Sequence, residues 1–348
     1  MRSHFALLAL AFVSSPALAD HMGPSGVASG GGQIVFGPDT LDEGHGSLGF
    51  RLTFTRPEQR SDAVLEALAG QHIHAHNTNY NLNASVGAAY GITHELTLSA
   101  ELPYVRRDGL REGEHSHVDG QAINEVTQLG NVAGIGDLNV LAKYRLTHGD
   151  GLNVAAVIGL KVPTGRTGVR SPDGERLETE HQPGTGSWDP IVGASAGSTL
   201  GPVQLAASAL YQFSGRGAQD TRLGDRFQAG VALSHRFGIA DHDHAEPAHH
   251  HDHDDDGDND GDHHAHPAHA SWDGFVELSG EWEGRQTIAG EVEEESGGKA
   301  LWLTPGARFT SAGGFSFGAS VGLPAWQRIR ASHPKNRYRV SLAVARAF

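Results

Sequence analysis

The sequence predicts an all-β protein, a transmembrane up-and-down antiparallel β-barrel of about 12 strands in the bacterial outer membrane. Three observations predict it: a leader at the N-terminus, about a dozen segments of alternating hydrophobicity, and a final alternating strand, 338–348, that ends on Phe348. No apolar run is long enough for a spanning helix, and in lipid only helices and closed barrels satisfy every backbone hydrogen-bonding group. A soluble β-sandwich or solenoid is the alternative, but it would not need aromatic residues at its strand ends.

The first 19 residues predict a signal peptide. A short basic start precedes an apolar core, Phe5–Val13, and Ala17-Leu-Ala19 is a cleavage site of the small-x-small type. The core is too short to span a membrane as an anchor. We therefore expect residues 1–19 to be removed, residues 20–45 to be a flexible N-terminal segment, and residues 46–348 to form the barrel.

Alternation of apolar and polar residues locates the strands. In 224–237, Phe227 and Val231 share one face while Gln228 and Ser234 share the other, because successive side chains point to opposite faces of a strand. Such segments begin near Ser47, Tyr80, His94, Gly136, Gly151, Ser187, Pro202, Asp225, Ser271, Lys299, Gly314 and Arg337. An even number of strands places both termini on the periplasmic side.

The lengths of the connections follow the same parity, because periplasmic turns of such barrels are short and extracellular loops are long. Tight turns are expected at 91–93, 148–150, 200–202 and 312–314. Long extracellular loops are expected at 57–78, 108–133, 164–185, 286–298 and 327–336. The exception is 239–270, a long insert between strands eight and nine that parity places on the periplasmic side. The final strand also resembles the C-terminal signal of bacterial barrels, so the barrel-assembly machinery is an expected partner, beside outer-membrane lipid.

Charged residues on the predicted inward faces carry both signs. The lumen candidates are Lys143, Arg145, Lys161, Arg236, Glu277, Glu281, Arg308 and Arg339, together with Arg51, Glu101 and Glu283. Charges are costly on the lipid face of a barrel and natural inside a wet lumen. Two interpretations remain open: a lattice of salt bridges that rigidifies the wall, or a selectivity filter for solutes.

The insert accounts for most of the formal charge of −15. Residues 241–270 hold ten Asp and Glu residues and no Lys or Arg, so the rest of the chain carries −5. With almost no apolar side chains, the insert is expected to be disordered. Nowhere are basic residues concentrated enough to indicate nucleic-acid binding.

The same insert predicts labile metal binding, because imidazole nitrogen suits Zn, Cu and Ni and carboxylates add charge attraction. The candidate ligands are His242, His244, His249, His250, His251, His253, His263, His264, His266 and His269. Many overlapping ligand sets favour loose binding and fast exchange of several ions, unlike a closed structural site. The alternative is a solvated charged linker without a specific role.

Two weaker metal signals accompany the insert. Residues 252–257 match the first half of a calcium loop, but His263 stands at the twelfth position in place of the bidentate Glu. We interpret this match as acidic low complexity. Smaller histidine groups, His72, His74 and His76 and also His115 and His117, lie in predicted extracellular loops, where alternating imidazoles can point to one side and chelate.

Enzyme motifs are present but lack their context. Gly193-Ala-Ser-Ala-Gly197 and Gly318-Ala-Ser-Val-Gly322 match G-x-S-x-G, which requires a sharp strand-to-helix turn to expose its serine. Both matches lie inside predicted strands with no helix following. The sequence therefore predicts a protein that is not an enzyme.

Three segments resemble the phenol-degradation MetA-type family of outer-membrane transporters. They are Gly134-Ile-Gly-Asp-Leu-Asn-Val-Leu-Ala-Lys-Tyr-Arg-Leu146, Gly159-Leu-Lys-Val-Pro-Thr-Gly-Arg166 and Gln182-Pro-Gly-Thr-Gly-Ser-Trp-Asp-Pro190. The segment 95–104 fits the same pattern, so the likeness covers roughly residues 45 to 237. The resemblance implies an outer-membrane channel or transporter, in some members for hydrophobic compounds.

These features predict an outer-membrane channel or transporter linked to divalent transition metals through the insert, with small solutes or metal ions as its cargo. Two alternatives remain: a passive pore for small hydrophobic or aromatic compounds, and a non-transporting metal-buffering structural barrel. The metal link is preferred because the insert departs from the family pattern. No cofactor is required, although labile Zn, Cu or Ni ions are expected on the insert.

Overall fold

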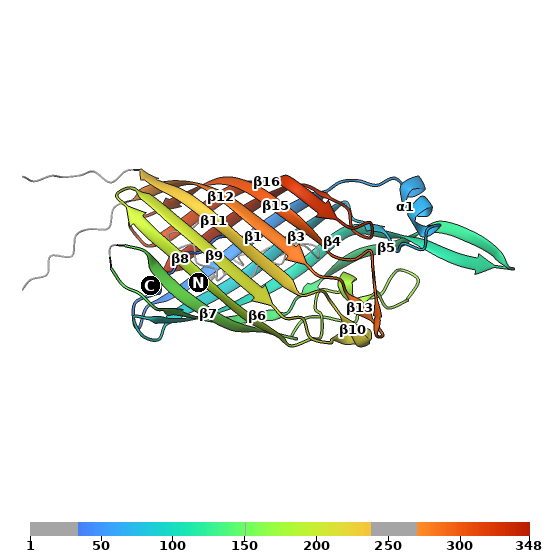
Figure 1. Ribbon diagram of the computed structural model, residues 1–348, viewed down its shortest axis with the longest axis horizontal. Helices are drawn as coiled ribbons and strands as arrows, with labels where there is room; N and C mark the ends of the chain where they lie inside the picture. The colour runs from blue at the N-terminus through green and yellow to red at the C-terminus, as the bar shows by residue number, and fades with distance from the viewer. Residues whose placement is uncertain (1–33, 150, 238–269) are drawn as a thin grey trace, which may run out of the picture.

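The computed structural model describes residues 34–149, 151–237 and 270–348. In these ranges, twelve strands close into one antiparallel barrel in which neighbours along the chain are neighbours in the wall (Figure 1). They are β1 (Gly46–Pro57), β3 (Tyr80–Gly91), β4 (Leu96–Val118), β6 (Leu138–Arg145), β7 (Asn153–Val162), β8 (Asp189–Leu200), β9 (Val203–Gln212), β11 (Arg226–Phe237), β12 (Ser271–Glu283), β15 (Gly298–Thr310), β16 (Phe315–Ile329) and β17 (Asn336–Ala347). The predicted fold class and strand number are confirmed.

The first and last strands close the wall. β1 pairs with β17 from Ser47 opposite Ala347, and the amides of Gly46 and Phe348 each donate to the other residue's carbonyl, at 2.8 and 2.9 Å. At the other side of β3, β4 pairs with β6 from Leu96 opposite Tyr144. Closure leaves no free strand edge in the wall, which is what lipid demands of a spanning sheet.

The two faces of the wall differ as the alternation predicts. On β11, Val231 and Leu233 are 54% and 50% exposed on the outer face, whereas Ala232 and Ser234 are buried inside. Large apolar side chains of every other barrel strand are likewise exposed on the outside, among them Leu48, Val86, Leu98, Val140, Ile158, Val192, Leu205, Val276, Leu303, Phe317 and Leu342. Outside a bilayer such a belt would be an unfavourable surface, and within one it is the lipid-facing band.

The smaller elements lie at one end of the barrel, here called the loop end (Figure 1). They are α1 (Asp62–Ala69), β2 (His76–Asn77), β5 (Gln121–Ile135), η1 (Thr179–His181), η2 (Ala218–Asp220), β10 (Thr221–Arg222), β13 (Thr287–Ile288) and β14 (Glu291–Val292). The opposite, turn end carries the short connections between β3 and β4, β8 and β9, and β15 and β16. By the rule for such barrels the loop end faces outward and the turn end faces the periplasm. Among the described residues, no helix is long and apolar enough to cross a membrane.

One predicted loop has regular structure. The sequence predicts a long extracellular loop over 108–133, and this connection does lie at the loop end, but in it β4 continues to Val118 and pairs with β5 in a hairpin that projects beyond the barrel. Its turn is Asp119-Gly120, with φ values of 52° and 79°. Positive φ at both central residues is the two-residue hairpin turn for which Asp-Gly is a strong sequence signal, so this signal was present and unused.

Residues 34–38 are buried against the inner wall and 40–45 contact the turn end near 91–97, whereas the sequence predicts a flexible segment over 20–45. Val35 and Phe36 are almost completely buried, because the apolar wall under them offers more favourable surroundings than water. A Cβ at Gly197 would lie 2.8 Å from Pro38, and one at Gly230 would lie 2.7 Å from Val35. These inward-facing glycines thus provide the room in which the segment lies. Residues 20–33 are outside the described ranges.

Candidate functional site

The barrel interior and its loop-end mouth form the candidate functional site. Of the predicted lumen residues, Lys143, Lys161, Glu277, Arg308 and Arg339 are buried within the barrel, and Arg145, Arg236 and Glu281 are half-buried. Arg145 lies near the turn end, where its Nε donates to the carbonyl of Thr147 at 3.1 Å. The side chains that line the interior form three groups: a network of ion pairs, residues that bind the N-terminal segment, and an apolar strip.

Ion pairs connect neighbouring strands across the inner wall. Lys161 on β7 stands opposite Asp189 on β8, and its Nζ lies 2.6 Å from Asp189 Oδ2 and 3.4 Å from Asp137 Oδ2. On β11 and β12, Arg236 and Asp273 form two contacts, Nε–Oδ1 at 2.8 Å and Nη2–Oδ2 at 3.3 Å. Such bidentate pairs fix the geometry of both side chains.

A third ion pair joins two strands that are not neighbours in the wall. Arg339 on β17 reaches Glu281 on β12 at 3.0 and 3.3 Å, although β15 and β16 lie between these strands. Trp302 on β15 joins them: its Nε1 donates to Glu281 Oε2 at 3.0 Å, and the Arg339 guanidinium stacks 4.1 Å from the ring centre. At these positions the charged side chains pair with one another. This favours a lattice of salt bridges that rigidifies the wall over a selectivity filter for solutes.

Two further lumen residues hold the N-terminal segment. Glu277 Oε1 accepts hydrogen bonds from the amides of Ile34 and Val35, at 2.8 and 3.2 Å. Gly37 O accepts from Lys143 Nζ at 3.3 Å and from Ser195 Oγ at 3.2 Å. Ser195, which sits in a G-x-S-x-G match, is therefore a wall residue inside β8, and the other match lies inside β16.

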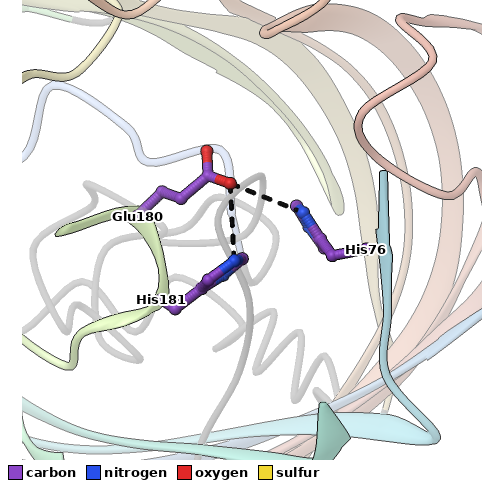
Figure 2. Close-up of side chains that lie close together, drawn as sticks. All are labelled: His76, Glu180 and His181. Atoms are coloured by element: carbon purple, nitrogen blue, oxygen red, sulfur yellow. Dashed lines mark ion pairs between the residues drawn. The ribbon is translucent and has the colours of Figure 1, made fainter. Parts of the chain in front are cut away.

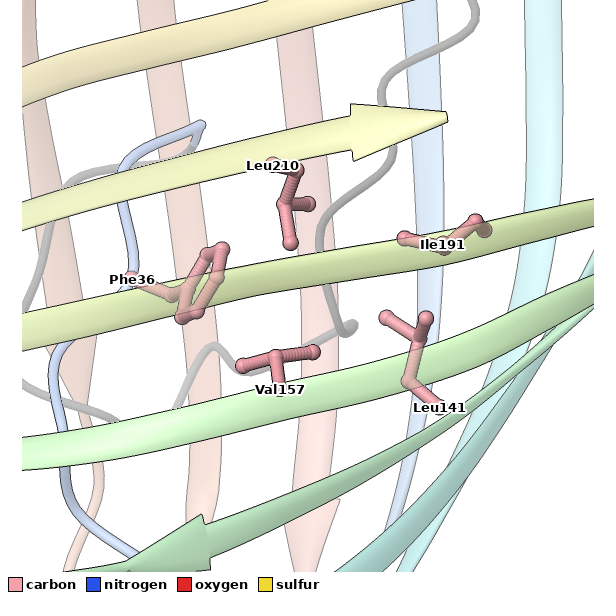
Figure 3. Packing of buried hydrophobic residues seen from close by; sticks show 5 residues of the cluster. All are labelled: Phe36, Leu141, Val157, Ile191 and Leu210. Carbon is pink, nitrogen blue, oxygen red and sulfur yellow. The ribbon is translucent and has the colours of Figure 1, made fainter. Parts of the chain in front are cut away.

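An apolar strip interrupts the polar interior. Leu141, Val157, Ile191 and Leu210 come from four consecutive wall strands, β6 to β9, and their side chains pack around the ring of Phe36 (Figure 3). The strip is thus an apolar surface on one side of the lumen, and Phe36 of the N-terminal segment packs on it.

The connection between β7 and β8, residues 163–188, folds inward over the loop-end mouth. Asp137 anchors it: Oδ1 accepts from the Gly165 amide at 2.9 Å, and Oδ2 accepts from the Thr185 amide at 2.8 Å and from its hydroxyl at 2.7 Å. Within the connection, residues 179–184 are buried. A polar pocket lies beside them and is lined by Arg107, Glu180, Gln182, Arg226, Glu283 and His333.

Histidines and carboxylates meet at this mouth (Figure 2). Glu180 Oε1 lies 3.5 Å from His76 Nδ1 and 3.6 Å from His181 Nε2. The His76 ring packs edge-on against the rings of His181 and His333, with centroids 4.7 and 4.6 Å apart. Glu112 Oε2 approaches His181 Nε2 to 3.7 Å. Only His76 of this group was singled out from the sequence, because the others are scattered along the chain.

The protonation states at the mouth follow from burial and neighbouring charge. Burial holds the pKa of His76 well below its usual range, and the adjacent His333 and His181 lower it further. Burial likewise lowers the pKa of His333. Burial would raise the pKa of Glu112, but its interactions with His181 and His74 outweigh this and lower it to about 2.

The ten predicted metal ligands of 241–270 lie outside the described residues, and the strand ends that flank them, Phe237 and Ser271, are at the turn end. His115 and His117 sit on the projecting hairpin, where His115 packs against His72 and His117 with ring centroids 4.4 and 4.9 Å apart.

Comparisons with known proteins agree with this architecture. The sequence model of the family described as "Putative MetA-pathway of phenol degradation" matches residues 27–271. The crystal structure of an outer membrane channel from Pseudomonas putida F1 aligns with a TM-score of 0.53 at 16% identity, covering 89% of this chain and 97% of that one. This likeness shows the shared barrel fold.

Two further solved barrels align less closely. LpxR from Salmonella typhimurium has a TM-score of 0.41 at 10% identity, covering 86% of this chain and 99% of that one. The CymD monoaromatic hydrocarbon channel has a TM-score of 0.41 at 11% identity, covering 97% and 99%. No curated protein matches the chain.

Proposed function

Because the chain belongs to the family described as "Putative MetA-pathway of phenol degradation", we propose that this outer-membrane barrel is a passive channel for small aromatic compounds. The observation that carries the proposal is the apolar strip of Leu141, Val157, Ile191 and Leu210, which binds one aromatic ring inside an otherwise polar lumen. An aromatic solute that displaces Phe36 would bury its ring there, while its polar substituent faces the charged wall. Pockets with an apolar surface and a few placed polar groups are typical of small-molecule sites.

The pairing of the wall charges supports a lumen that neither strongly attracts nor strongly repels charged solutes. Lys161, Arg236 and Arg339 each have a carboxylate partner within 3.0 Å, so their net field on a solute is small. The wall then supplies a rigid polar surface, and discrimination falls to the apolar strip. Catalysis has no part in the proposal, since both candidate serines lie within wall strands where no nucleophile elbow exists.

The test is the permeability of the refolded barrel to benzoate and acetate, which share a charge but differ in the aromatic ring. Reversal potentials in planar bilayers with benzoate on one side and acetate on the other give the permeability ratio. We expect benzoate to be favoured beyond its free-solution mobility, and Phe36→Ala to increase benzoate flux several-fold by vacating the strip. Phe227→Ala, which removes a ring from the lipid-exposed outer face, should change neither quantity.

Other outcomes separate the rival functions. A ratio equal to that of the free ions in both proteins would indicate an aqueous pore without aromatic preference. Complete absence of conductance in the protein and in Phe36→Ala would favour the closed, metal-buffering barrel.

The metal-collecting insert is a second candidate function, and its support is compositional: ten histidines and ten acidic residues in 241–270. On this proposal, loosely held Zn, Cu or Ni ions are concentrated at the periplasmic mouth, beside the pore that they enter or leave. Replacing the ten histidines by asparagine should lower the metal content and alter the metal tolerance of cells. Unchanged content and tolerance would rule out the role.

A further inference from the structure

Three connections far apart in sequence bring buried histidines together at the loop-end mouth. His76 lies in β2, which follows α1; His181 ends η1 in the inward-folded connection; and His333 lies between β16 and β17. They are 8%, 2% and 7% exposed. Fully buried imidazoles are uncommon unless a partner satisfies them, so their convergence requires an explanation.

The distances among the ligand atoms suit a small cation. His76 Nδ1, His181 Nε2 and a carboxylate oxygen of Glu180 lie within 4.8 Å of one another, and the two nitrogens are 3.5 and 3.6 Å from Glu180 Oε1. A tetrahedral ion with bonds of about 2.0–2.1 Å separates its ligand atoms by about 3.3 Å. Both histidine nitrogens therefore already lie close to this separation from Glu180 Oε1.

The same atoms lack hydrogen-bond partners. His76 Nδ1 and His181 Nε2 are both buried, and neither has a partner among the described residues. A buried polar atom without a hydrogen-bond partner is destabilising, and here two such atoms lie close to one carboxylate oxygen. A bound cation would satisfy both nitrogens at once.

Surrounding groups hold the donors in place. Gln286 Nε2 donates to Glu180 Oε2 at 2.7 Å, leaving Oε1 directed at the histidines. Ser332 Oγ is 2.7 Å from His333 Nδ1, so the other ring nitrogen, Nε2, faces Glu180 Oε2 at 4.0 Å. Hydrogen bonds of this kind orient metal-binding histidines and set their tautomers.

The chain also fixes the backbone of each donor. Arg107 Nη1 donates to the carbonyls of His181 and Gln182 at 2.6 and 3.1 Å, and the His76 amide donates to Ser332 O at 3.0 Å. The site is thus preorganised by contacts that do not involve the ligand atoms themselves.

We propose that His76, Glu180 and His181 form a site for one divalent transition-metal ion of the Zn²⁺ class. Two imidazoles with one carboxylate suit Zn²⁺, Ni²⁺ or Cu²⁺ rather than Ca²⁺ or Mg²⁺. The ion would tie the three connections together across the mouth. This site is separate in sequence from the His-rich insert, and the strand ends that flank the insert, Phe237 and Ser271, lie at the opposite, turn end.

The test measures retained zinc in a full-length background in which the ten histidines of 241–270 are replaced by asparagine. The protein is loaded with Zn²⁺, passed over gel filtration with a weak competing chelator, and analysed for metal by mass spectrometry. We expect one zinc per chain in the background and a loss of at least tenfold in His76→Ala/His181→Ala. The matched variant His115→Ala/His117→Ala, which removes two histidines from the projecting hairpin, should retain one.

A background protein that retains no zinc would overturn the proposal, as would a site variant that retains as much as the background. If the double variant does not fold, Glu180→Gln replaces it, because it preserves side-chain shape and should weaken Zn²⁺ at least tenfold. Substitution by Co²⁺ gives an independent measurement: intense visible absorption is expected for a tetrahedral nitrogen and oxygen site, and the weak spectrum of hydrated Co²⁺ contradicts it. Metal content is independent of permeability, so these outcomes do not depend on channel function.

Discussion

Single residues in the lumen act mainly through their partners. The Arg339 guanidinium is nearly inaccessible and is shared between the Glu281 carboxylate and the Trp302 ring. Sequence parity predicted that Arg339 and Glu281 face inward, but it could not predict that they meet. They come from strands separated by two others in the wall, and only the curvature of the closed barrel brings them within 3.0 Å.

Arg339→Leu should destabilise the barrel by about 3 kcal/mol, because removal of one partner leaves the other as a buried, uncompensated charge. Equilibrium unfolding by guanidinium chloride in lipid vesicles measures the change. The matched Arg337→Leu, two residues earlier on β17 and exposed, should shift stability by less than about 0.5 kcal/mol.

A second substitution distinguishes pairing from packing. If the uncompensated charge is the cause, Glu281→Gln combined with Arg339→Gln should recover more than half of the lost stability. A double variant as unstable as Arg339→Leu would instead assign the effect to lost packing on Trp302.

At the scale of elements, the inward-folded connection 163–188 determines the shape of the mouth. It crosses itself closely: a Cβ at Gly165 would lie 2.5 Å from the Cα of Gly184, so glycine is required at the crossing. The segments that contain these glycines were identified from the sequence as family-like motifs. That these two segments are held together was not predictable from the sequence. It depends on Asp137, which lies on a different connection and accepts hydrogen bonds from the amides of Gly165 and Thr185.

Asp137→Ala should loosen this connection. The loss of three charge-assisted hydrogen bonds, at about 1.5 kcal/mol each, lowers the free energy of local opening by about 4.5 kcal/mol. Hydrogen exchange at the Gly165 and Thr185 amides reports it directly. Asp173→Ala, at an exposed position in the same connection, should leave both exchange rates unchanged, and equal acceleration in the two variants would refute the anchoring role.

The whole molecule depends on its last strand. β17 supplies the pairing for β1 that closes the wall, and Phe348 completes it through two backbone hydrogen bonds with Gly46. Phe348 is also 62% exposed, so its ring is accessible at the turn end and is not part of the packed interior. An exposed terminal ring agrees with the expected recognition by assembly machinery.

Phe348→Ser should therefore reduce the amount of barrel assembled in the outer membrane several-fold while leaving the stability of refolded protein within about 1 kcal/mol, since little buried area is lost. Quantitative immunoblotting of outer-membrane fractions measures assembly, and unfolding in vesicles measures stability. Phe348→Tyr keeps an aromatic ring and should assemble normally. An equal loss of stability and assembly in Phe348→Ser would mean that the ring closes the wall rather than marking it.

The sequence by itself determined the barrel, its twelve strands and the inward or outward direction of most wall residues. These follow from a period of two along the chain, which is local and is enforced by lipid on one face and water on the other. Strand starts inferred from this period agree with the structure within two residues for all twelve wall strands. The Asp119-Gly120 turn was equally local and could have been predicted.

Only the tertiary structure decided which residues meet inside the barrel. The ring of Phe36 in its apolar strip, the Glu281–Arg339 pair and the histidines at the mouth all join segments remote in sequence. Their meeting depends on how the wall curves and on how far each connection folds inward. Those distances are set by the closed barrel as a whole, and no periodicity along the chain encodes them.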